Sequence, residues 1–255
     1  MERKELVRNL VSYAASYASE DVRFFYKLQH SLEVAQICET IAKSLHLREH
    51  DVELAWVIGL VHDIGRFAQL EQTSSLKDTN VFNHGSYGYQ LLSDRLIYDF
   101  WDVPADYSLI LTAVRYHNVL ALPDTLNSRE NLFCNIVRDA DIVDIFHCLF
   151  VSDFDILFGF TREELQQSDV SSEVMEYVLR KELVDVKHIK TPMDKYMSSC
   201  SMYFGLVFPV SVDIALRQGY YQKLLDFPFL ANTNIRMMEV LKKNVDEFTK
   251  AKRIL

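Results

Sequence analysis

The stretch from Gly59 to Phe67, "GLVHDIGRF", places His62 and Asp63 side by side in an apolar run. A buried carboxylate next to a buried imidazole costs free energy unless both are paired or hold a metal ion. The preceding residues, "VELAWVIGLV", are typical of a buried helix, so the pair falls in the last turn of that helix. Other polar groups along the chain are therefore expected to hold this pair.

The composition predicts an all-α protein. Of the 255 residues, 49% are apolar and 25% are charged, which is ordinary for a globular protein. Only 7 glycines and 5 prolines interrupt the chain, whereas an all-β protein needs a tight turn roughly every ten residues. The length suits one large domain or one domain with an appendage.

Charge and hydropathy argue against two classes of partner, nucleic-acid polymers and membranes. The net charge of −9 argues against a nucleic-acid polymer, because binding to a phosphate backbone depends on clustered Lys and Arg. A small anionic substrate stays compatible with this charge if a metal ion supplies positive charge locally. The chain has no apolar run of about 18 residues and no pattern of a signal peptide at its start, so we expect no membrane association and a cytoplasmic location.

Helical periodicity is clear in the first half of the chain. In "HSLEVAQICETIAKSLHL" the apolar residues recur every three or four positions and share a face with His30. The next helix is expected to begin near Asp51 and to end near Gly65 in a left-handed stop. Residues 68–83 are polar and are expected to form a loop.

Three further helical segments are expected to carry polar residues among apolar ones. Asn83 is placed to cap a helix that begins with His84, and a segment that starts at Pro104 ends near His117. The strongly apolar "RENLFCNIVRDADIVDIFHCLF" carries three aspartates. Asp139 cannot share a face with Asp141 because positions i and i+2 diverge on a helix, so it is expected to be exposed or capping.

The order of six polar residues resembles a known family. The elements are the helical His30, "HDIGR" at His62 and Asp63, "NHG" at His84, "RYHN" at His117 and "RDADIVD" at Asp141. This order resembles the HD superfamily of metal-dependent phosphohydrolases, over roughly residues 25–150. An HD dipeptide alone is a weak pattern, but six positions in order, each in helical context, are specific.

The resemblance implies a helical bundle and a metal centre. It implies that residues 1–150 form the metal-binding domain, and we expect 151–255 to be a helical extension packed on it that helps to complete the substrate pocket. The resemblance also implies that Asp63 bridges two metal ions, the first held with His30, His62 and Asp141, and the second with His84 and His117. Imidazole and carboxylate ligands suit one or two divalent ions of Fe, Mn, Co, Ni or Zn.

Other residues are candidates for substrate contacts. Arg66 follows Asp63 by three residues, where many relatives carry Lys, and a guanidinium suits bidentate contact with a phosphate. The alternative for Arg66 is a salt bridge at a helix end. Asp144 is a candidate for orienting a ligand or contacting substrate. Arg115 and Arg138 are candidates for phosphate binding, with a structural role as the alternative.

Three functions stay open at this point. The first is a phosphohydrolase that cleaves a phosphomonoester or phosphodiester, expected to be a nucleotide from the habits of the family, with a metal-activated water. The second is a di-iron oxygenase of the same superfamily acting on a small polar substrate, and the third is a nucleotide-binding module without catalysis. The apolar helices near the C-terminus are expected either to pack inward or to form a homodimer face.

Overall fold

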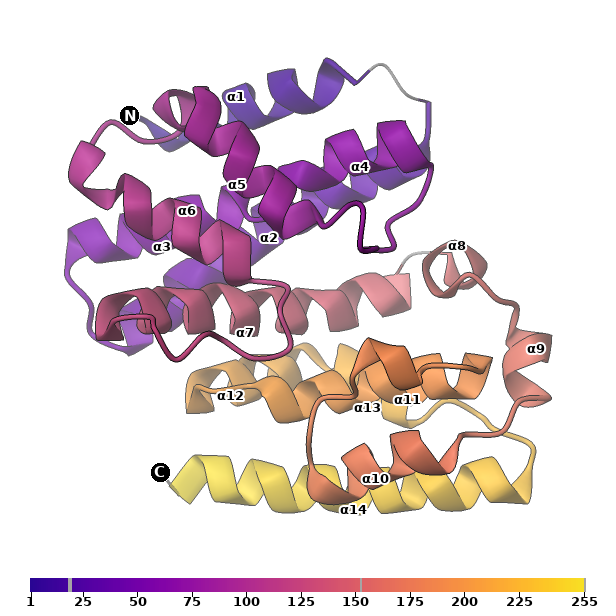
Figure 1. Cartoon of the computed structure of the whole chain (residues 1–255). Coiled ribbons are helices and arrows are strands. Elements are labelled where there is room, and N and C mark those ends of the chain that lie inside the picture. Colours follow the sequence, from indigo (N-terminus) through magenta and orange to yellow (C-terminus); the bar gives the residue numbers. More distant parts are fainter. Residues whose placement is uncertain (18–19, 152, 255) are drawn as a thin grey trace. The chain divides into compact units, whose positions relative to one another are not determined.

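The computed structural model describes residues 1–17, 20–151 and 153–254, and over these residues the protein is all-α, without β-strands (Figure 1). The chain divides into two compact units, Met1–Asp141 and Ile142–Leu255. None of the described helices is long and apolar enough to cross a membrane.

The first unit contains most of the helices that carry the predicted site. Its elements are α1 (Arg3–Ala15), α2 (Val22–Ser44), α3 (Glu49–Val61), α4 (Gly65–Thr73), α5 (His84–Asp94), the 3₁₀ helices η1 (Leu96–Asp99) and η2 (Pro104–Asp106), α6 (Tyr107–Tyr116) and the first part of α7 (Ser128–Val151).

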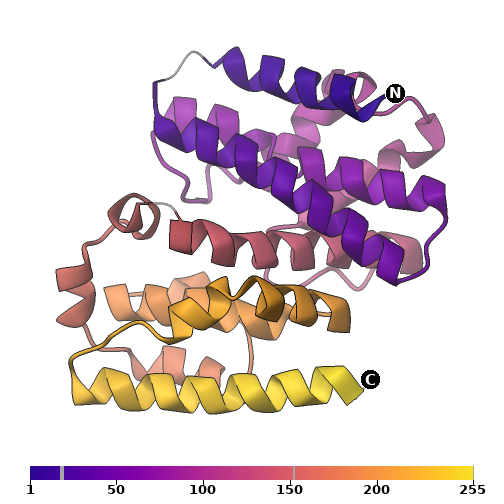
Figure 2. The same ribbon diagram turned by 180° about the vertical axis from the view of Figure 1, so that it is seen from behind.

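Helix α3 lies in the core of the first unit and packs along α2. Figure 2 shows α2 from the side on which α1 lies. Every residue from Leu54 to Val61 is buried. A Cβ on Gly59 would lie 2.8 Å from Ala35 Cα, so the missing side chain allows the two backbones to approach. This close contact fixes the end of α3, where His62 and Asp63 follow.

The predicted end of α3 is wrong in its detail. The helix ends at Val61, and the chain turns through His62, Asp63 and Ile64 before α4 begins at Gly65. Gly65 does not adopt the left-handed conformation. A glycine is needed there for packing, since a Cβ would lie 2.2 Å from the backbone oxygen of His84. The start of α3 is also two residues earlier than expected, at Glu49, and Asp51 lies inside its first turn.

The loop predicted for residues 68–83 is shorter than expected. Helix α4 continues to Thr73, and the left-handed stop is Ser74 with φ of 52°. The polar residues of α4 misled the prediction, since their partners lie in the following loop. The cap predicted at Asn83 is confirmed, because its side chain accepts a hydrogen bond from the Ser86 N–H at 2.9 Å.

The second unit contains the end of α7 and the later helices. They are α8 (Phe154–Phe158), α9 (Arg162–Gln166), α10 (Ser172–Arg180), η3 (Val186–His188), α11 (Pro192–Ser201), η4 (Met202–Gly205), α12 (Pro209–Gln218), α13 (Tyr220–Leu225) and α14 (Asn232–Ile254).

Helix α14 packs its apolar residues inside the second unit. Met238, Leu241 and Val245 are buried, and α14 contacts α10, α12 and η4 (Figure 1). Of the two outcomes expected for the C-terminal apolar helices, these residues take the inward one.

Candidate metal centre

The six polar residues of the sequence pattern come from five places in the first unit. His30 lies in α2, His62 and Asp63 in the turn after α3, and His84 is the first residue of α5. His117 follows the last residue of α6, and Asp141 lies in α7. The structure brings all six side chains together, and the four imidazoles are at most 4% exposed.

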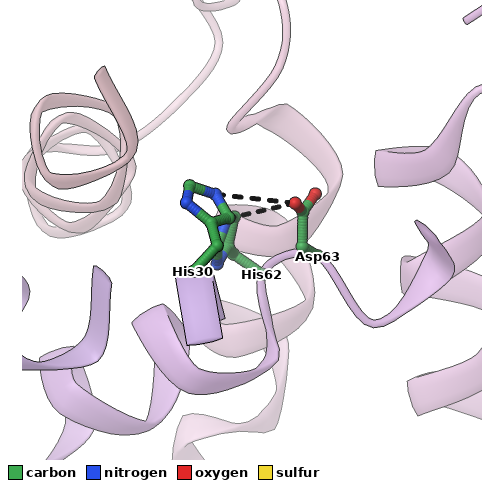
Figure 3. A group of neighbouring side chains, drawn as sticks. All are labelled: His30, His62 and Asp63. Carbon is green, nitrogen blue, oxygen red and sulfur yellow. Dashed lines mark hydrogen bonds and ion pairs between the residues drawn. The ribbon is translucent and has the colours of Figure 1, made fainter. Parts of the chain in front are cut away.

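One half of the cluster gathers around His30. Its Nε2 atom lies 3.0 Å from Asp141 Oδ1, 3.3 Å from His62 Nε2 and 3.6 Å from Asp63 Oδ2. Figure 3 shows His30, His62 and Asp63 turned toward one another. Four side chains thus direct nitrogen or oxygen atoms at a common point.

The other half gathers around the second oxygen of Asp63. Asp63 Oδ1 lies 3.1 Å from His84 Nε2 and 3.5 Å from His117 Nε2. The two Nε2 atoms are 2.8 Å apart. The carboxylate of Asp63 therefore lies between two groups of side chains and turns one oxygen to each.

The hydrogen bonds of the outer ring nitrogens set the tautomers. His62 Nδ1 is 2.7 Å from the Gly59 carbonyl, and His117 Nδ1 is 2.7 Å from the Val114 carbonyl. A carbonyl only accepts, so each Nδ1 carries the proton and each Nε2 presents a lone pair to the cluster. His84 Nδ1 has the same role toward the Asp78 carboxylate, at 2.7 Å.

This donor set fits divalent metal ions. Lone pairs on His84 Nε2, His117 Nε2 and Asp63 Oδ1 converge within 3.5 Å, and they repel unless a cation or a proton lies between them. Ligand atoms about 2.1 Å from one ion lie about 3.0–3.4 Å from each other in octahedral or tetrahedral geometry. The contacts in both halves are close to this spacing, so the residues present suit an ion in each half.

Electrostatics keep the cluster in the protonation state that ligands need. Burial alone would raise the pKa of Asp63, but the Lys27 ammonium holds it well below its usual value. The pKa of Asp141 is also well below its usual value, with the hydrogen bond from His30 opposing the effect of burial. Burial and the Arg66 guanidinium lower the pKa of His84, which keeps that imidazole neutral.

Two residues at the cluster were missed from the sequence. Lys27 Nζ donates to Asp63 Oδ2 at 2.7 Å, and Asp78 accepts from His84. Lys27 precedes His30 by one helical turn, a spacing that places both on one face of α2 and was available from the sequence. Asp78 comes from the loop after α4, and its distance along the chain from His84 follows no helical or strand period.

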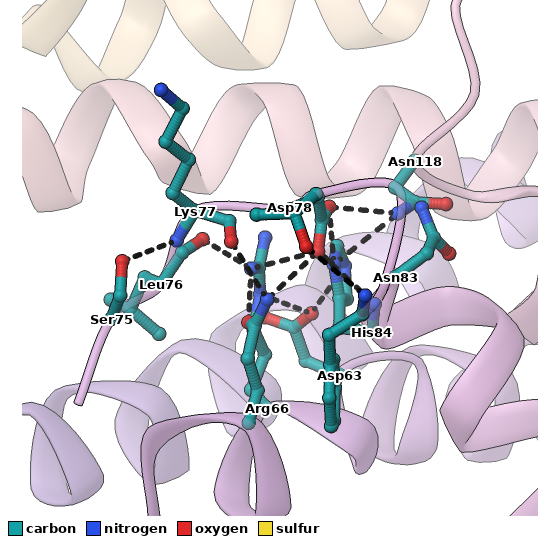
Figure 4. Close-up of polar contacts among 12 residues, drawn as sticks. Asp63, Arg66, Ser75, Leu76, Lys77, Asp78, Asn83, His84 and Asn118 are labelled. Carbon is teal, nitrogen blue, oxygen red and sulfur yellow. Dashed lines mark hydrogen bonds and ion pairs between the residues drawn. The ribbon is translucent and has the colours of Figure 1, made fainter. Parts of the chain in front are cut away.

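Arg66 lies beside the cluster and makes several contacts. Its Nε is 3.5 Å from Asp63 Oδ1, and its Nη1 donates to Gln69 Oε1 at 2.6 Å and to the Leu76 carbonyl at 2.5 Å. Figure 4 shows this guanidinium between Asp63 and the 74–83 loop. The side chain thus combines a position at the cluster with a role in holding the loop.

Arg115 and Asp144 are the other predicted substrate contacts. Arg115 is exposed, stacks on Tyr89 and Tyr116 with its guanidinium 5.2 and 5.4 Å from their ring centres, and borders a cavity of about 480 Å³. Asp144 belongs to the second unit, where its Oδ1 is 3.2 Å from His147 Nδ1.

Arg138 has the structural role that was its alternative. It donates to the carbonyls of Tyr116, at the end of α6, and of Val119 and Leu120 beyond it. The prediction for Asp139 is wrong, since its side chain is buried. The i and i+2 argument assumed that one face of α7 is open to solvent, whereas this helix is buried around much of its circumference.

A buried cluster of imidazoles and carboxylates in a helical unit is typical of a metal-binding domain. In the comparison with known families, residues 28–147 match the HD domain, whose superfamily consists mostly of metal-dependent phosphohydrolases. No curated protein and no solved structure gives a significant match.

Proposed function

We propose that the protein is a metal-dependent phosphohydrolase with a dinuclear metal centre. One observation carries this proposal: the two oxygens of Asp63 face two different pairs of imidazoles, His30 with His62 and His84 with His117. A carboxylate shared in this way is the arrangement that two adjacent cations need. A single structural ion would leave one pair of imidazoles without a partner.

The first ion would be held by His30, His62, Asp63 and Asp141, and the second by Asp63, His84 and His117. Fe, Mn, Co, Ni and Zn all suit this donor set. When bound, two such ions polarise a phosphoryl group and lower the pKa of a water between them. Asp63 is the residue on which this chemistry depends most, because it contacts both halves.

Cationic side chains next to Asp63 support a phosphorylated substrate. Lys27 lies at one oxygen of Asp63 and Arg66 at the other, at 2.7 and 3.5 Å. Arg66 uses Nη1 for the loop, so we propose that its other nitrogens meet the phosphate. Arg115 and Asp144 stay proposed substrate contacts, and the cavity that Arg115 borders is lined by none of the six proposed ligands.

We further propose that the substrate is a small phosphorylated molecule of nucleotide type. The support comes from the HD domain itself and from the positive side chains at Asp63. Release of inorganic phosphate from a panel of nucleoside mono-, di- and triphosphates, with sugar phosphates for comparison, tests the substrate class. Turnover restricted to sugar phosphates would contradict the nucleotide proposal and leave the phosphohydrolase intact.

The first experiment is metal analysis by elemental mass spectrometry on protein purified without chelator. We expect about two equivalents per chain, and anaerobic phosphate release with Mn or Co. His62→Ala protein, which lacks a ligand of the first ion, is the control and should show neither. If the metal is mostly iron and turnover consumes oxygen, the di-iron oxygenase replaces the hydrolase; metal and nucleotide bound without turnover would indicate a binding module.

A further inference from the structure

The 74–83 loop carries an acidic side chain that reaches the second half of the cluster. Asp78 places Oδ1 and Oδ2 at 2.8 and 2.7 Å from His84 Nδ1, and Oδ1 also accepts from the His84 backbone N–H at 3.1 Å. His84 is the first residue of α5, so its backbone N–H has no partner within the helix. One carboxylate therefore holds both the ring and the backbone of this residue.

The carboxylate of Asp78 is itself held from two sides. Gln69 Nε2 donates to Oδ1 at 3.0 Å, and Asn118 Nδ2 donates to Oδ2 at 3.1 Å. Gln69 is fully buried in α4, and Asn118 directly follows His117. Because each oxygen has its own donor, the carboxylate cannot rotate without losing a hydrogen bond, and Figure 4 shows Asp78 beside His84 and Asn118.

Helix α4 also holds the loop that carries Asp78. Gln69 Nε2 reaches the Lys77 carbonyl at 3.2 Å, Arg66 Nη1 reaches the Leu76 carbonyl, and Thr73 Oγ1 donates to the Ser75 carbonyl at 3.1 Å. These bonds involve three successive backbone carbonyls immediately before Asp78. A surface loop does not need hydrogen bonds from a neighbouring helix to three successive carbonyls for stability alone. A loop that must place one carboxylate accurately does need them.

We propose that Asp78 is the positioning residue of the second metal ion. It holds His84 with the proton on Nδ1 and the lone pair on Nε2, aims the ring at Asp63 and His117, and makes the imidazole more basic through a charge-assisted hydrogen bond. The inference rests on the proposed dinuclear centre. It assigns the 74–83 loop a role in loading one of the two ions and leaves the other unaffected.

The test is a titration of metal-free protein with Mn²⁺. Calorimetry measures the affinity of each ion, and electron paramagnetic resonance distinguishes single ions from exchange-coupled pairs. Asp78→Ala should weaken the second ion about 10–100-fold, as is usual when such a hydrogen-bonding partner is removed, and leave the first within about threefold. Asp78→Asn should fall between this variant and the wild type, since its amide oxygen still accepts the Nδ1–H bond without the charge. Lys77→Ala is the matched control, because Lys77 takes part in the network through its backbone carbonyl and N–H, which the substitution keeps.

Each outcome has a separate meaning. If Asp78→Ala and the wild type bind both ions with equal affinity, the role of Asp78 is refuted and the dinuclear centre stands. If the wild type binds only one ion, the dinuclear centre fails, and the inference fails with it. Thermal unfolding of the metal-free variants checks that each folds, and Asp78→Asn provides the answer if Asp78→Ala does not fold.

Discussion

At the scale of single residues, the cluster is defined by which atom of each side chain faces inward. His62 and His117 both direct Nδ1 at the carbonyl three residues earlier, Gly59 in one case and Val114 in the other. The same local bond at the end of two different helices presents Nε2 to the site in both. A histidine placed directly after the last turn of a helix is thus oriented by its own helix.

The two halves of the cluster should lose their ions separately. His84→Ala removes one of three ligands of the second ion, so we expect about one equivalent of metal to remain. His30→Ala should lose the first ion and all turnover. Elemental mass spectrometry and phosphate release measure both effects, and loss of both ions from His84→Ala would show that the halves are not independent.

Lys27 should stabilise the fold of the metal-free protein and weaken the binding of metal ions. Its ammonium bonds Asp63 Oδ2 at 2.7 Å and is mostly buried, so Lys27→Met should destabilise the metal-free protein by about 1–3 kcal/mol. The loss of a positive charge beside the site should also tighten Mn²⁺ binding several-fold. Urea unfolding and calorimetry measure the two effects.

The control for Lys27 is Lys43→Met on the same helix. Lys43 pairs with Glu39, but its side chain is 64% exposed, so both quantities should stay close to those of the wild type. If Lys27→Met binds metal more weakly than the wild type, Lys27 supports the centre in another way, for example by orienting Asp63.

At the scale of helices, the site depends on how closely α4 and α5 approach. His84 belongs to α5, while Asp63 and Arg66 lie just before and within the first turn of α4. Gly65 lies at the contact, where a side chain would meet the backbone of His84 and of Gly88. The distance between the two helices thus sets the distance between the bridging carboxylate and the second half of the cluster.

Gly65→Ala should destabilise the protein and weaken the second ion. The added methyl group meets backbone atoms, which cannot move aside, and such overpacking costs about 1–3 kcal/mol. Gly205→Ala is the control, because the methyl group there meets the flexible end of Leu183 at 3.0 Å and should be tolerated better. Urea unfolding compares the two, and an equal cost would mean that backbone contact does not decide the effect at Gly65.

Arg3 should make the stability of the first unit depend on acid pH. It lies in α1 and bonds Glu39 of α2 at 2.9 Å and Glu53 of α3 at 2.6 Å. The hydrogen bond from Arg3 lowers the pKa of Glu39 from 4.5 to about 2. A lowered carboxylate pKa contributes stability that is complete above pH 4.5 and is lost as the pH falls toward 2.

The matching variant is Arg3→Met. We expect it to be less stable than the wild type by about 1 kcal/mol near neutral pH, because the pairs are partly exposed. The difference should shrink between pH 4.5 and 2, where Glu39 becomes protonated in both proteins. Urea unfolding over this range measures it, and a constant difference would mean that Arg3 acts through its contact with Trp56 instead.

At the scale of the whole molecule, all six proposed ligands belong to the first of the two compact units. The boundary between the units falls inside α7, between Asp141 and Ile142. The division into a metal-binding domain over 1–150 and an extension over 151–255, which contributes to the substrate pocket, stays a prediction.

Metal removal should lower the stability of the protein. An ion that binds only the folded state stabilises that state by about 2.7 kcal/mol when its free concentration is a hundred times its dissociation constant. Calorimetry of the full chain with Mn²⁺ and with chelator should show a higher unfolding temperature in the first case. His62→Ala, which keeps the three ligands of the second ion, should show a smaller difference, and a wild type that shows no difference would contradict metal binding at the cluster.

The sequence was sufficient to predict the all-α class and several of its helices, and the resemblance to a family selected the six polar positions of the cluster. Helical periodicity placed His30 on the apolar face of its helix, and the cap at Asn83 located the start of the helix that carries His84. These features depend on residues three or four positions apart along the chain. Backbone hydrogen bonds and side-chain contacts within a helix have this short range, so the sequence alone determines them.

The tertiary structure decided how these positions are completed. Asp78 contacts His84 from a loop, and Lys27 contacts Asp63 across 36 residues of chain. Gly65 was expected to end a helix by its backbone conformation, but it lacks a side chain because another helix passes beside it. These contacts arise from the packing of helices against each other. Patterns over three or four residues do not determine which residue from a distant part of the chain will contact a given side chain.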